Sequence, residues 1–234
     1  MKDNIQTTNL HNYNLHSFST HSSMDLTKII IIFPLLVSFT SATSVIDFCV
    51  ADFNFPVTPA GYPCRNPANL TADDFVYSGL GVPGNPLVNN FDFVGALAID
   101  LTFPALNGLG LSLGRLDIGV GGAVPIHSHR VSEIILMIEG TIIAGFIDSN
   151  NTAYYKTLNK GDVMIFPHTL LHFQVNVGDA PALAFVSLNS ANPGFQFTTT
   201  SIGANDLPTE IIQRITLFDA AQVQKLKGLF GGTN

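Results

Sequence analysis

The sequence has few charged residues and no concentration of positive charge. Asp, Glu, Lys and Arg make up only 12% of its 234 residues, the ten Lys and Arg are scattered, and the formal net charge is -7. Proteins that bind nucleic acids or anionic membrane surfaces do so through clustered Lys and Arg. The sequence therefore predicts neither kind of partner, and its 46% hydrophobic content predicts a chain that buries its own core.

The sequence also lacks an apolar run long enough to cross a bilayer, for which about 20 residues are needed. The run "IIIIFPLLV" (29–37) follows Lys28 and precedes the small residues of "SFTSATS". This order is typical of a secretory signal peptide. We therefore expect an N-terminal extension and signal at residues 1–43, with the signal core at about 24–43, and one mature domain at 44–234.

Cysteine is scarce, since only Cys49 and Cys64 occur, both just after the expected cleavage point. An exported chain meets oxidising conditions, so we expect a disulfide between them and not a metal pair. In the chain-entropy model a loop of this size adds about 3 kcal/mol of stability. The sequons "NLT" at Asn69 and "NNT" at Asn150 predict N-glycosylation, which agrees with export.

Internal repeats of about 20 to 50 residues are absent, which excludes solenoids and propellers. Residues 54–90 are rich in Pro, Gly and Asn and are expected to form loops. From about residue 111 to 189, short apolar or alternating runs are separated by turn signals such as Gly121-Gly122 and Gly178-Asp179. Strands at this spacing predict an antiparallel sandwich or barrel.

Two short helices are expected after the strands, at about 206–230. Asp206 is a candidate N-cap with Pro208 in the first turn, and Asp219 is a candidate cap for the second helix. Their apolar faces would pack on the barrel or cover a neighbouring subunit. These faces contain Ile211, Ile212, Ile215, Val223, Leu226, Leu229 and Phe230. The predicted fold is all-β, with a short C-terminal helical extension.

Histidines gather in two of the strand-like runs. In "VPIHSHRVSEIILMIEG" (124–140), His127 and His129 would lie on the same face of a strand. Glu133 follows His129 by four residues. In "GDVMIFPHTLLHFQVN" (161–176), His172 begins a strand, whereas His168 follows a proline and is expected at a surface turn. An isolated pair of histidines is often only exposed to solvent. The further histidine in the second run favours a metal site.

Three imidazoles and one carboxylate, from His127, His129, Glu133 and His172, would face the inside of a small barrel. Such a mixed nitrogen and oxygen set suits a divalent first-row ion with positions left for water or substrate. Manganese or iron would fit, and zinc is the alternative on affinity. The aromatic residues near these runs are expected to be core packing. They are Phe146, Phe166, Phe173 and Phe185.

The spacing of these residues matches two cupin motifs. The first contains Gly121, His127, His129, Glu133 and Gly140, and the second contains Gly161, Pro167, His172 and Asn176. The segments "DFCVADF", "PAGYPC" and "DDFVYSGLG" and the C-terminal "FDAAQVQKLKGLFGGTN" extend the match. Over residues 24–234 the chain resembles the plant germin-like proteins, in particular those described as auxin-binding.

This resemblance implies a jelly-roll β-barrel that holds manganese through His127, His129, Glu133 and His172. It also implies the Cys49–Cys64 disulfide, export to the apoplast or cell wall, and a homohexamer built as a trimer of dimers, with the C-terminal helices interlocking subunits. Activities of the family include superoxide dismutation and, in true germins, oxalate oxidation.

The chain departs from the family pattern at three places. "HRVSE" is one residue shorter than usual between the second histidine and Glu133, and Thr169 stands where glycine is usual, which is costly if that turn needs a positive φ. Gly114 and Val124 stand where true oxalate oxidases have asparagines near the metal. Without these amides an oxalate dianion loses its polar partners, so we do not expect oxalate oxidation.

Three functions are therefore compared. The first is a manganese superoxide dismutase. The second is a binding module that holds a small carboxylated aromatic such as auxin, with its carboxylate on the metal and its ring among apolar side chains. The third is a structural or storage protein of the cell wall in which the metal serves stability.

Overall fold

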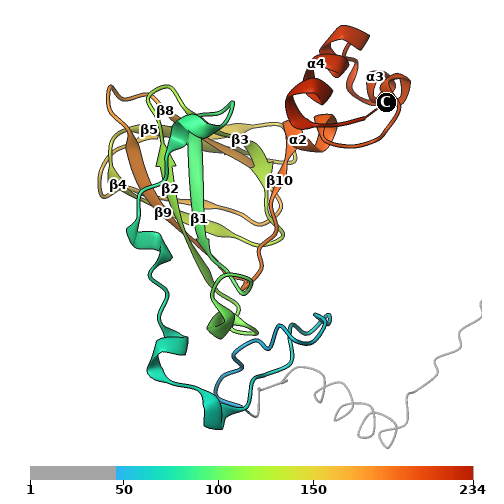
Figure 1. The fold of residues 1–234 in the computed structure, drawn as a ribbon. Helices are drawn as coiled ribbons and strands as arrows, with labels where there is room; N and C mark the ends of the chain where they lie inside the picture. Colours follow the sequence, from blue (N-terminus) through green and yellow to red (C-terminus); the bar gives the residue numbers. More distant parts are fainter. Residues whose placement is uncertain (1–45, 234) are drawn as a thin grey trace, which may run out of the picture. The chain divides into compact units, whose positions relative to one another are not determined.

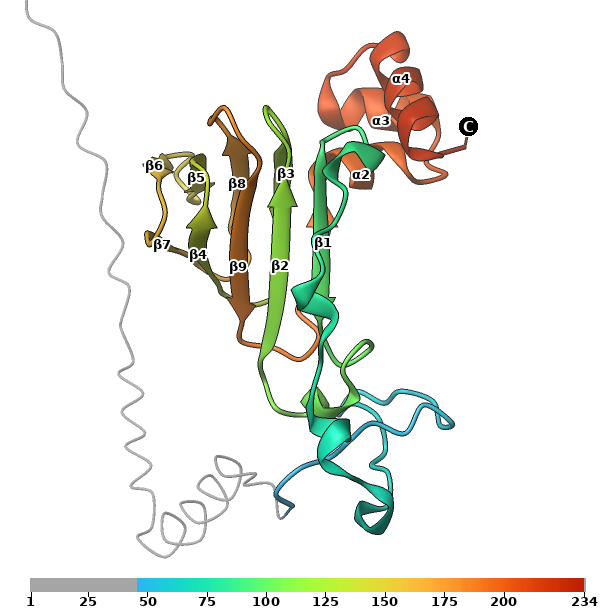
Figure 2. The same cartoon turned by 60° about the vertical axis from the view of Figure 1, so that its left-hand side comes forward.

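The computed structural model describes residues 46–233, and the expected signal segment lies outside them. Two antiparallel sheets face each other in this range (Figure 1). The first sheet contains, in order, β1 (Phe93–Ala98), β2 (Ser112–Ile118), β9 (Ala182–Leu188), β4 (Glu133–Glu139) and β7 (Val163–Phe166). The second contains β10 (Gln196–Phe197), β3 (Ala123–Ser128), β8 (Leu171–Asn176), β5 (Ile142–Ile147) and β6 (Ala153–Leu158). Figure 2 shows β1, β2, β9 and β4 side by side.

Alternating side chains explain why these strands form two layers. Along β4, Glu133, Ile135 and Met137 are buried while Ile134 and Leu136 are exposed, as expected for a strand with one face on the core. The core between the sheets includes Leu116, Ile118, Val124, Ile142, Ala144, Leu158, Phe166, Ala182, Ala184, Val186 and Leu188. The predicted all-β jelly-roll architecture is confirmed.

The seven strand-like runs between residues 111 and 189 all form strands, which are β2 and β4 to β9. Three elements were not predicted: β1, β10 and the short helix α2 (Thr198–Gly203). β10 has two residues, too few to show an alternating pattern. The premise that His127 and His129 share a strand was only partly right, because β3 ends at Ser128 and His129 follows it.

Within residues 46–92, the helices are all short 3-10 helices. They are η1 (Pro67–Asn69), η2 (Ala72–Phe75), η3 (Gly79–Gly81) and η4 (Pro86–Val88), and a fifth, η5 (Pro104–Leu106), follows β1. Cys49 and Cys64 are joined by a disulfide near the start of this region. The loop-rich character predicted for residues 54–90 agrees with this arrangement.

Two further helices follow α2: α3 (Thr209–Thr216) and α4 (Ala220–Phe230). Asp219 caps α4 as predicted, because its carboxylate accepts from the Gln222 N–H at 2.8 Å while the Gln222 side chain accepts from the Asp219 N–H at 2.9 Å. The prediction that Asp206 caps α3 was wrong. That helix begins at Thr209, with Pro208 at the N-cap position.

The helices bury only part of their apolar faces. Ile212 and Val223 are buried, whereas Ile211, Ile215 and Leu229 are 45%, 68% and 47% exposed. α4 is tied to the segment before β1, since the ring of Phe230 stacks on that of Phe91 with centroids 6.0 Å apart. Within residues 46–233, none of the helices combines the length and the apolar character that crossing a membrane requires.

Candidate metal centre

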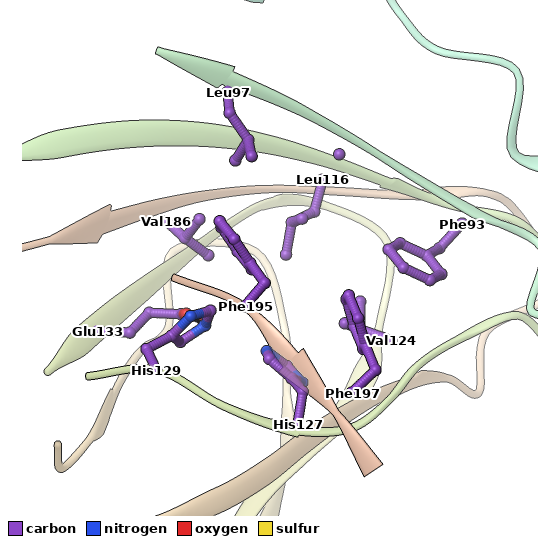
Figure 3. Close-up of a pocket in the computed structure, with 11 residues that line it drawn as sticks. Phe93, Leu97, Leu116, Val124, His127, His129, Glu133, Val186, Phe195 and Phe197 are labelled. Carbon is purple, nitrogen blue, oxygen red and sulfur yellow. Dashed lines mark ion pairs between the residues drawn. The ribbon is translucent and has the colours of Figure 1, made fainter. Parts of the chain in front are cut away.

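The four predicted ligand residues meet at one point inside the barrel. His127 is near the end of β3, His129 follows that strand, Glu133 begins β4, and His172 is the second residue of β8. Their donor atoms all lie within 4.8 Å of one another, and the four residues are only 2–4% exposed. Figure 3 shows the polar ends of His127, His129 and Glu133 turned toward one another.

Strand register explains how residues so distant in sequence come together. β3 pairs with β8 so that His127 lies directly opposite His172, and the centroids of the two rings are 4.0 Å apart. Glu133 is paired with Phe166 of β7, whose ring stacks on that of His172 with centroids 4.7 Å apart. The ligands are therefore positioned by sheet pairing and by a buried aromatic ring.

Each histidine uses its Nδ1 to bind a backbone carbonyl. The Nδ1 atoms of His127, His129 and His172 lie 2.8, 2.6 and 2.9 Å from the carbonyl oxygens of Pro125, Gly194 and Leu170. A carbonyl oxygen only accepts, so Nδ1 must be the protonated nitrogen in each ring. This tautomer leaves the lone pair of Nε2 available to a metal ion, the usual arrangement of a metal-binding histidine.

The Nε2 atoms face the carboxylate of Glu133. Oε2 of Glu133 lies 2.9 Å from Nε2 of His129 and 3.6 Å from Nε2 of His172. Neither nitrogen has a hydrogen-bond partner in the part of the chain that the structure describes. Lone pairs of a neutral imidazole and an ionised carboxylate repel at such distances unless a cation lies among them. Ligand bonds of about 2.1 Å place adjacent ligand atoms about 3 Å apart, so the cluster fits a metal ion.

The protonation states also suit a metal ion. Burial lowers the pKa of His127 from 6.5 to about 3, and the nearby His172 acts in the same direction. Burial alone would raise the pKa of Glu133, and a proton donated by the ring of His129 or His172 would lower it from 4.5 to about 2. Rings that are protonated at Nδ1 cannot donate from Nε2, so a cation among the ligands has to take this part and keep the carboxylate ionised. At neutral pH His127 is therefore neutral and Glu133 is ionised, as metal ligation requires.

An apolar cavity of about 340 Å³ opens beside the ligands. Its walls come from β1, β2, β3, β4, β9 and the segment around β10, and apart from the ligands they carry no polar side chain (Figure 3). They are formed by Phe93, Gly95, Leu97, Leu116, Val124, Val186, Phe195 and Phe197. A small molecule in this cavity would contact the metal on one side and hydrocarbon on the others.

Comparison with known proteins agrees with this geometry. A family model described as Cupin matches residues 78–224. Auxin-binding protein ABP19b of Prunus persica is 54% identical over 209 residues, 87% of this chain and 100% of that protein. Germin-like protein subfamily 3 member 3 of Arabidopsis thaliana is 49% identical over 200 residues, 85% of this chain and 94% of that protein. A solved structure of oxalate oxidase is 31% identical, covers 80% of this chain and 96% of its own, and superposes with a TM-score of 0.75.

The chain belongs to the germin-like proteins of the cupin family. Its shortened "HRVSE" segment still brings Glu133 to the cluster. Thr169 has a φ of 65°, so this germin-like chain holds a β-branched residue where the backbone favours glycine. The turn is tied to the site, because the N–H of Thr169 donates to the carbonyl of His129 at 3.1 Å.

The remaining predicted residues lie away from the cavity. His168 is exposed in the turn before β8, as expected from the sequence. Asn69 and Asn150 are both exposed, so each presents its side chain to solvent, and their glycosylation stays a prediction. Phe166 is completely buried, whereas Phe146, Phe173 and Phe185 are half-buried.

Sequence reasoning missed two features of the site. The aromatic residues that line the cavity are Phe93, Phe195 and Phe197, which lie on or near the unpredicted strands β1 and β10. It also missed Gln174, whose side-chain amide is completely buried and has no hydrogen-bond partner within residues 46–233. Strand alternation from His172 already places Gln174 on the inner face, so a period-of-two reading would have found it.

Proposed function

We propose that this germin-like protein is a secreted manganese protein of the plant apoplast or cell wall, with superoxide dismutase-type activity and without oxalate oxidase activity. Its main support is the cluster of three Nε2 atoms and one carboxylate, all acceptors, within 4.8 Å. Such a cluster is stable only around a cation. Nitrogen and oxygen ligands without a thiolate suit manganese or iron, with zinc as a further candidate.

A manganese ion in this cluster would supply a one-electron redox couple. Dismutation converts two superoxide ions and two protons into one dioxygen and one hydrogen peroxide, because one superoxide gives up an electron and the other accepts it with both protons. The residues of the chain bind and orient: Glu133 and the imidazoles hold the centre, and the apolar walls limit water. Gln174 is suited to hold a proton-donating water, since its buried amide needs a partner.

Oxalate is disfavoured by the side chains of the cavity. Val124 is 3% exposed and presents only methyl groups to it. Gly114, which is buried on β2 behind the lining residues Leu97 and Val186, has no side chain. An added Cβ at Gly114 would lie 2.9 Å from Cγ2 of Val186 and 3.0 Å from Cδ2 of Leu97, so an asparagine would not fit there without repacking. The cavity therefore offers no amide to a second carboxylate.

The alternative is non-enzymatic binding of a small apolar carboxylate of the auxin type. The cavity volume and its hydrocarbon walls favour an aromatic ring, and the names of the Prunus persica relatives describe auxin binding by those proteins. The protein contains no tryptophan. The fluorescence of indole-3-acetate can therefore be followed without a tryptophan background. A micromolar dissociation constant without dismutation would favour this alternative. A protein with only a structural or storage role in the cell wall would show neither dismutation nor binding of indole-3-acetate.

Export is supported by the chemistry of the chain outside the metal centre. The Cys49–Cys64 disulfide needs an oxidising compartment, and both sequon asparagines are exposed. The proposed signal peptide lies outside the described residues. N-terminal sequencing of the protein recovered from culture medium tests this proposal, and a first residue near Ser44 or Val45 is expected.

Assembly into a homohexamer is supported by two separate apolar surfaces. On the outer face of the first sheet, Ile134 pairs with Ile165 and Leu136 with Val163, and these four side chains are 39–54% exposed. The second surface is on α3, around Ile211 and Ile215. A trimer of dimers needs two different self-contacts. By light scattering, Ile165→Glu and Ile215→Glu should each give smaller assemblies, and hexamers in both variants would contradict the assignment of the surfaces.

The function is tested by metal analysis together with superoxide dismutation on the secreted protein. The wild type should contain about one manganese per chain, and His127→Ala should lose both metal and activity. His168→Ala is the matched control, because it removes an exposed histidine four residues from a ligand. Bound metal without dismutation would move the function to ligand binding or structure, and a wild type without metal would contradict the site itself.

A further inference from the structure

A second, polar hollow of about 460 Å³ lies against the metal centre. Its wall is shared with the apolar cavity through two side chains, His129 and Phe195. The ring of Phe195 stands edge-on to that of His129 with centroids 4.6 Å apart, and Figure 3 shows it beside this ligand. The other residues of the hollow are Ser128, Arg130, Thr169, Gly194 and Gln196.

Arg130 is the charged residue of this hollow and is held in a fixed position. Its Nη2 donates to the backbone oxygen of Asn192 at 3.0 Å and to Oδ1 of the same residue at 3.4 Å. Asn192 is oriented in turn, because its Nδ2 donates to Oδ1 of the buried Asp100 at 3.3 Å. Asn192 therefore presents its oxygens to the guanidinium.

The guanidinium also packs on the backbone that orients a metal ligand. A Cβ built on Gly194 would lie 3.1–3.2 Å from Cζ, Nε and Nη2 of Arg130, so three atoms of the planar group are equally close to Gly194. The carbonyl of Gly194 accepts from Nδ1 of His129. The guanidinium of Arg130 thus packs against the residue whose carbonyl orients the second histidine of the cluster.

The positive charge of Arg130 is not neutralised by a neighbour. Arg65 and Arg115 form ion pairs with Asp74 and Asp117, whereas no described carboxylate lies within ion-pair distance of Arg130. Its contacts are neutral oxygens, and in residues 46–233 its Nε and Nη1 have no hydrogen-bond partner. These donors remain free for an anion.

We propose that Arg130 is the anion-collecting residue of the metal centre. It attracts a small anion, superoxide or the carboxylate of an organic ligand, into the polar hollow beside His129, from which the anion enters the cavity past Phe195. The overall charge of -7 repels anions, so a local positive group at the entrance is needed for rapid capture. The identity of the anion rests on the proposed function, whereas the binding of an anion by Arg130 does not.

The test compares Arg130→Gln with Arg130→Lys and with Arg214→Gln, which removes an exposed positive charge on α3. Chloride is the first probe, and its binding to the manganese-loaded and metal-free proteins is measured by the quadrupolar broadening of the chloride NMR signal. We expect Arg130→Gln to lose broadening that Arg130→Lys and Arg214→Gln retain. Displacement of chloride by indole-3-acetate or formate would identify a carboxylate as an occupant.

The second readout is dismutation as a function of ionic strength. Arg130→Gln should retain its manganese and its kcat, lose about tenfold in kcat/KM at low salt, and lose the dependence of kcat/KM on salt. Equal broadening and equal salt dependence in Arg130→Gln and Arg214→Gln would overturn the proposal. Chloride binding that depends on Arg130 in a protein without dismutation would uphold anion collection and contradict the dismutase function alone.

Discussion

Oε2 of Glu133 lies 2.9 Å from Nε2 of His129, although both atoms are acceptors in the protonation states that the site favours. A cation between them resolves this repulsion. We therefore predict that Glu133→Gln, which keeps the shape and removes the charge, lowers manganese affinity by at least about 100-fold. Metal titration of the chelator-treated protein measures this. Glu139→Gln, on an exposed position at the end of the same strand, should bind metal normally. Equal affinities in the two variants would exclude Glu133 as a ligand.

The ion pair between Arg115 and Asp117 should make stability depend on acid pH. Burial alone would raise the pKa of Asp117, but the guanidinium of Arg115 and the Gly84 N–H outweigh it and lower this pKa below 3.8. Because the folded-state pKa is depressed, the stabilisation is complete above about pH 5. It is lost as pH falls below 3.8 and through the folded-state value.

Asp117→Asn should therefore lower the free energy of unfolding by about 1–3 kcal/mol at neutral pH. The difference from wild type should shrink as the pH falls through the lowered folded-state pKa of Asp117, below which both side chains are neutral. Urea unfolding of metal-free protein across this range measures the effect without the contribution of metal release. A difference that stays constant with pH would show that the carboxylate charge does not stabilise the fold.

Thr169 carries backbone strain next to the metal centre. Its φ of 65° costs a β-branched residue about 1–2 kcal/mol, more than the entropy that glycine loses on folding. Thr169→Gly should therefore raise the free energy of unfolding by about 1 kcal/mol, with manganese content unchanged because the bond from the residue 169 N–H to His129 remains. Thermal unfolding measures the change, and in this experiment Thr169→Ala, which keeps a Cβ, should gain less stability than Thr169→Gly. A glycine variant less stable than wild type would mean that the Oγ1 bond to the His168 carbonyl outweighs the strain.

Most of the barrel and all four candidate ligands could be predicted from the sequence, because alternation and motif spacing are local patterns. His172 lies in the candidate cluster and His168 is exposed, as the place of His172 in a strand predicted. The cavity could not be predicted in the same way. Phe195 and Phe197 reach it through β10, a two-residue strand paired with β3, and that pairing joins residues almost 70 positions apart.

The anion site was missed for the same physical reason. In the sequence Arg130 is one of ten scattered cations. Arg130 follows His129 directly, but the position of its guanidinium in the polar hollow depends on Asn192 and Gly194, which are more than 60 residues away along the chain. Asn192 and Gly194 lie in the segment after β9 that brings the chain back to the metal centre. Contacts made by such a segment produce no periodic pattern in the sequence. The error at Asp206 has a different cause, since Pro208 shifted the start of α3 to Thr209.

Gln174 lies two residues after His172 on the inner face of β8, and neither polar atom of its amide has a hydrogen-bond partner among the described residues. A buried unpaired amide costs about 1–3 kcal/mol, so an amide without a function would be better replaced by an apolar group of the same shape. We predict that Gln174→Leu keeps its manganese and unfolds at the same or a higher temperature. Dismutation should fall about 10- to 100-fold, because the amide proposed to hold a proton-donating water is lost. Gln224→Leu, on an exposed face of α4, should leave the rate unchanged. If the Gln174 variant instead loses metal and stability together, the amide supports the fold, and if its rate is unchanged, protons reach the centre by another route.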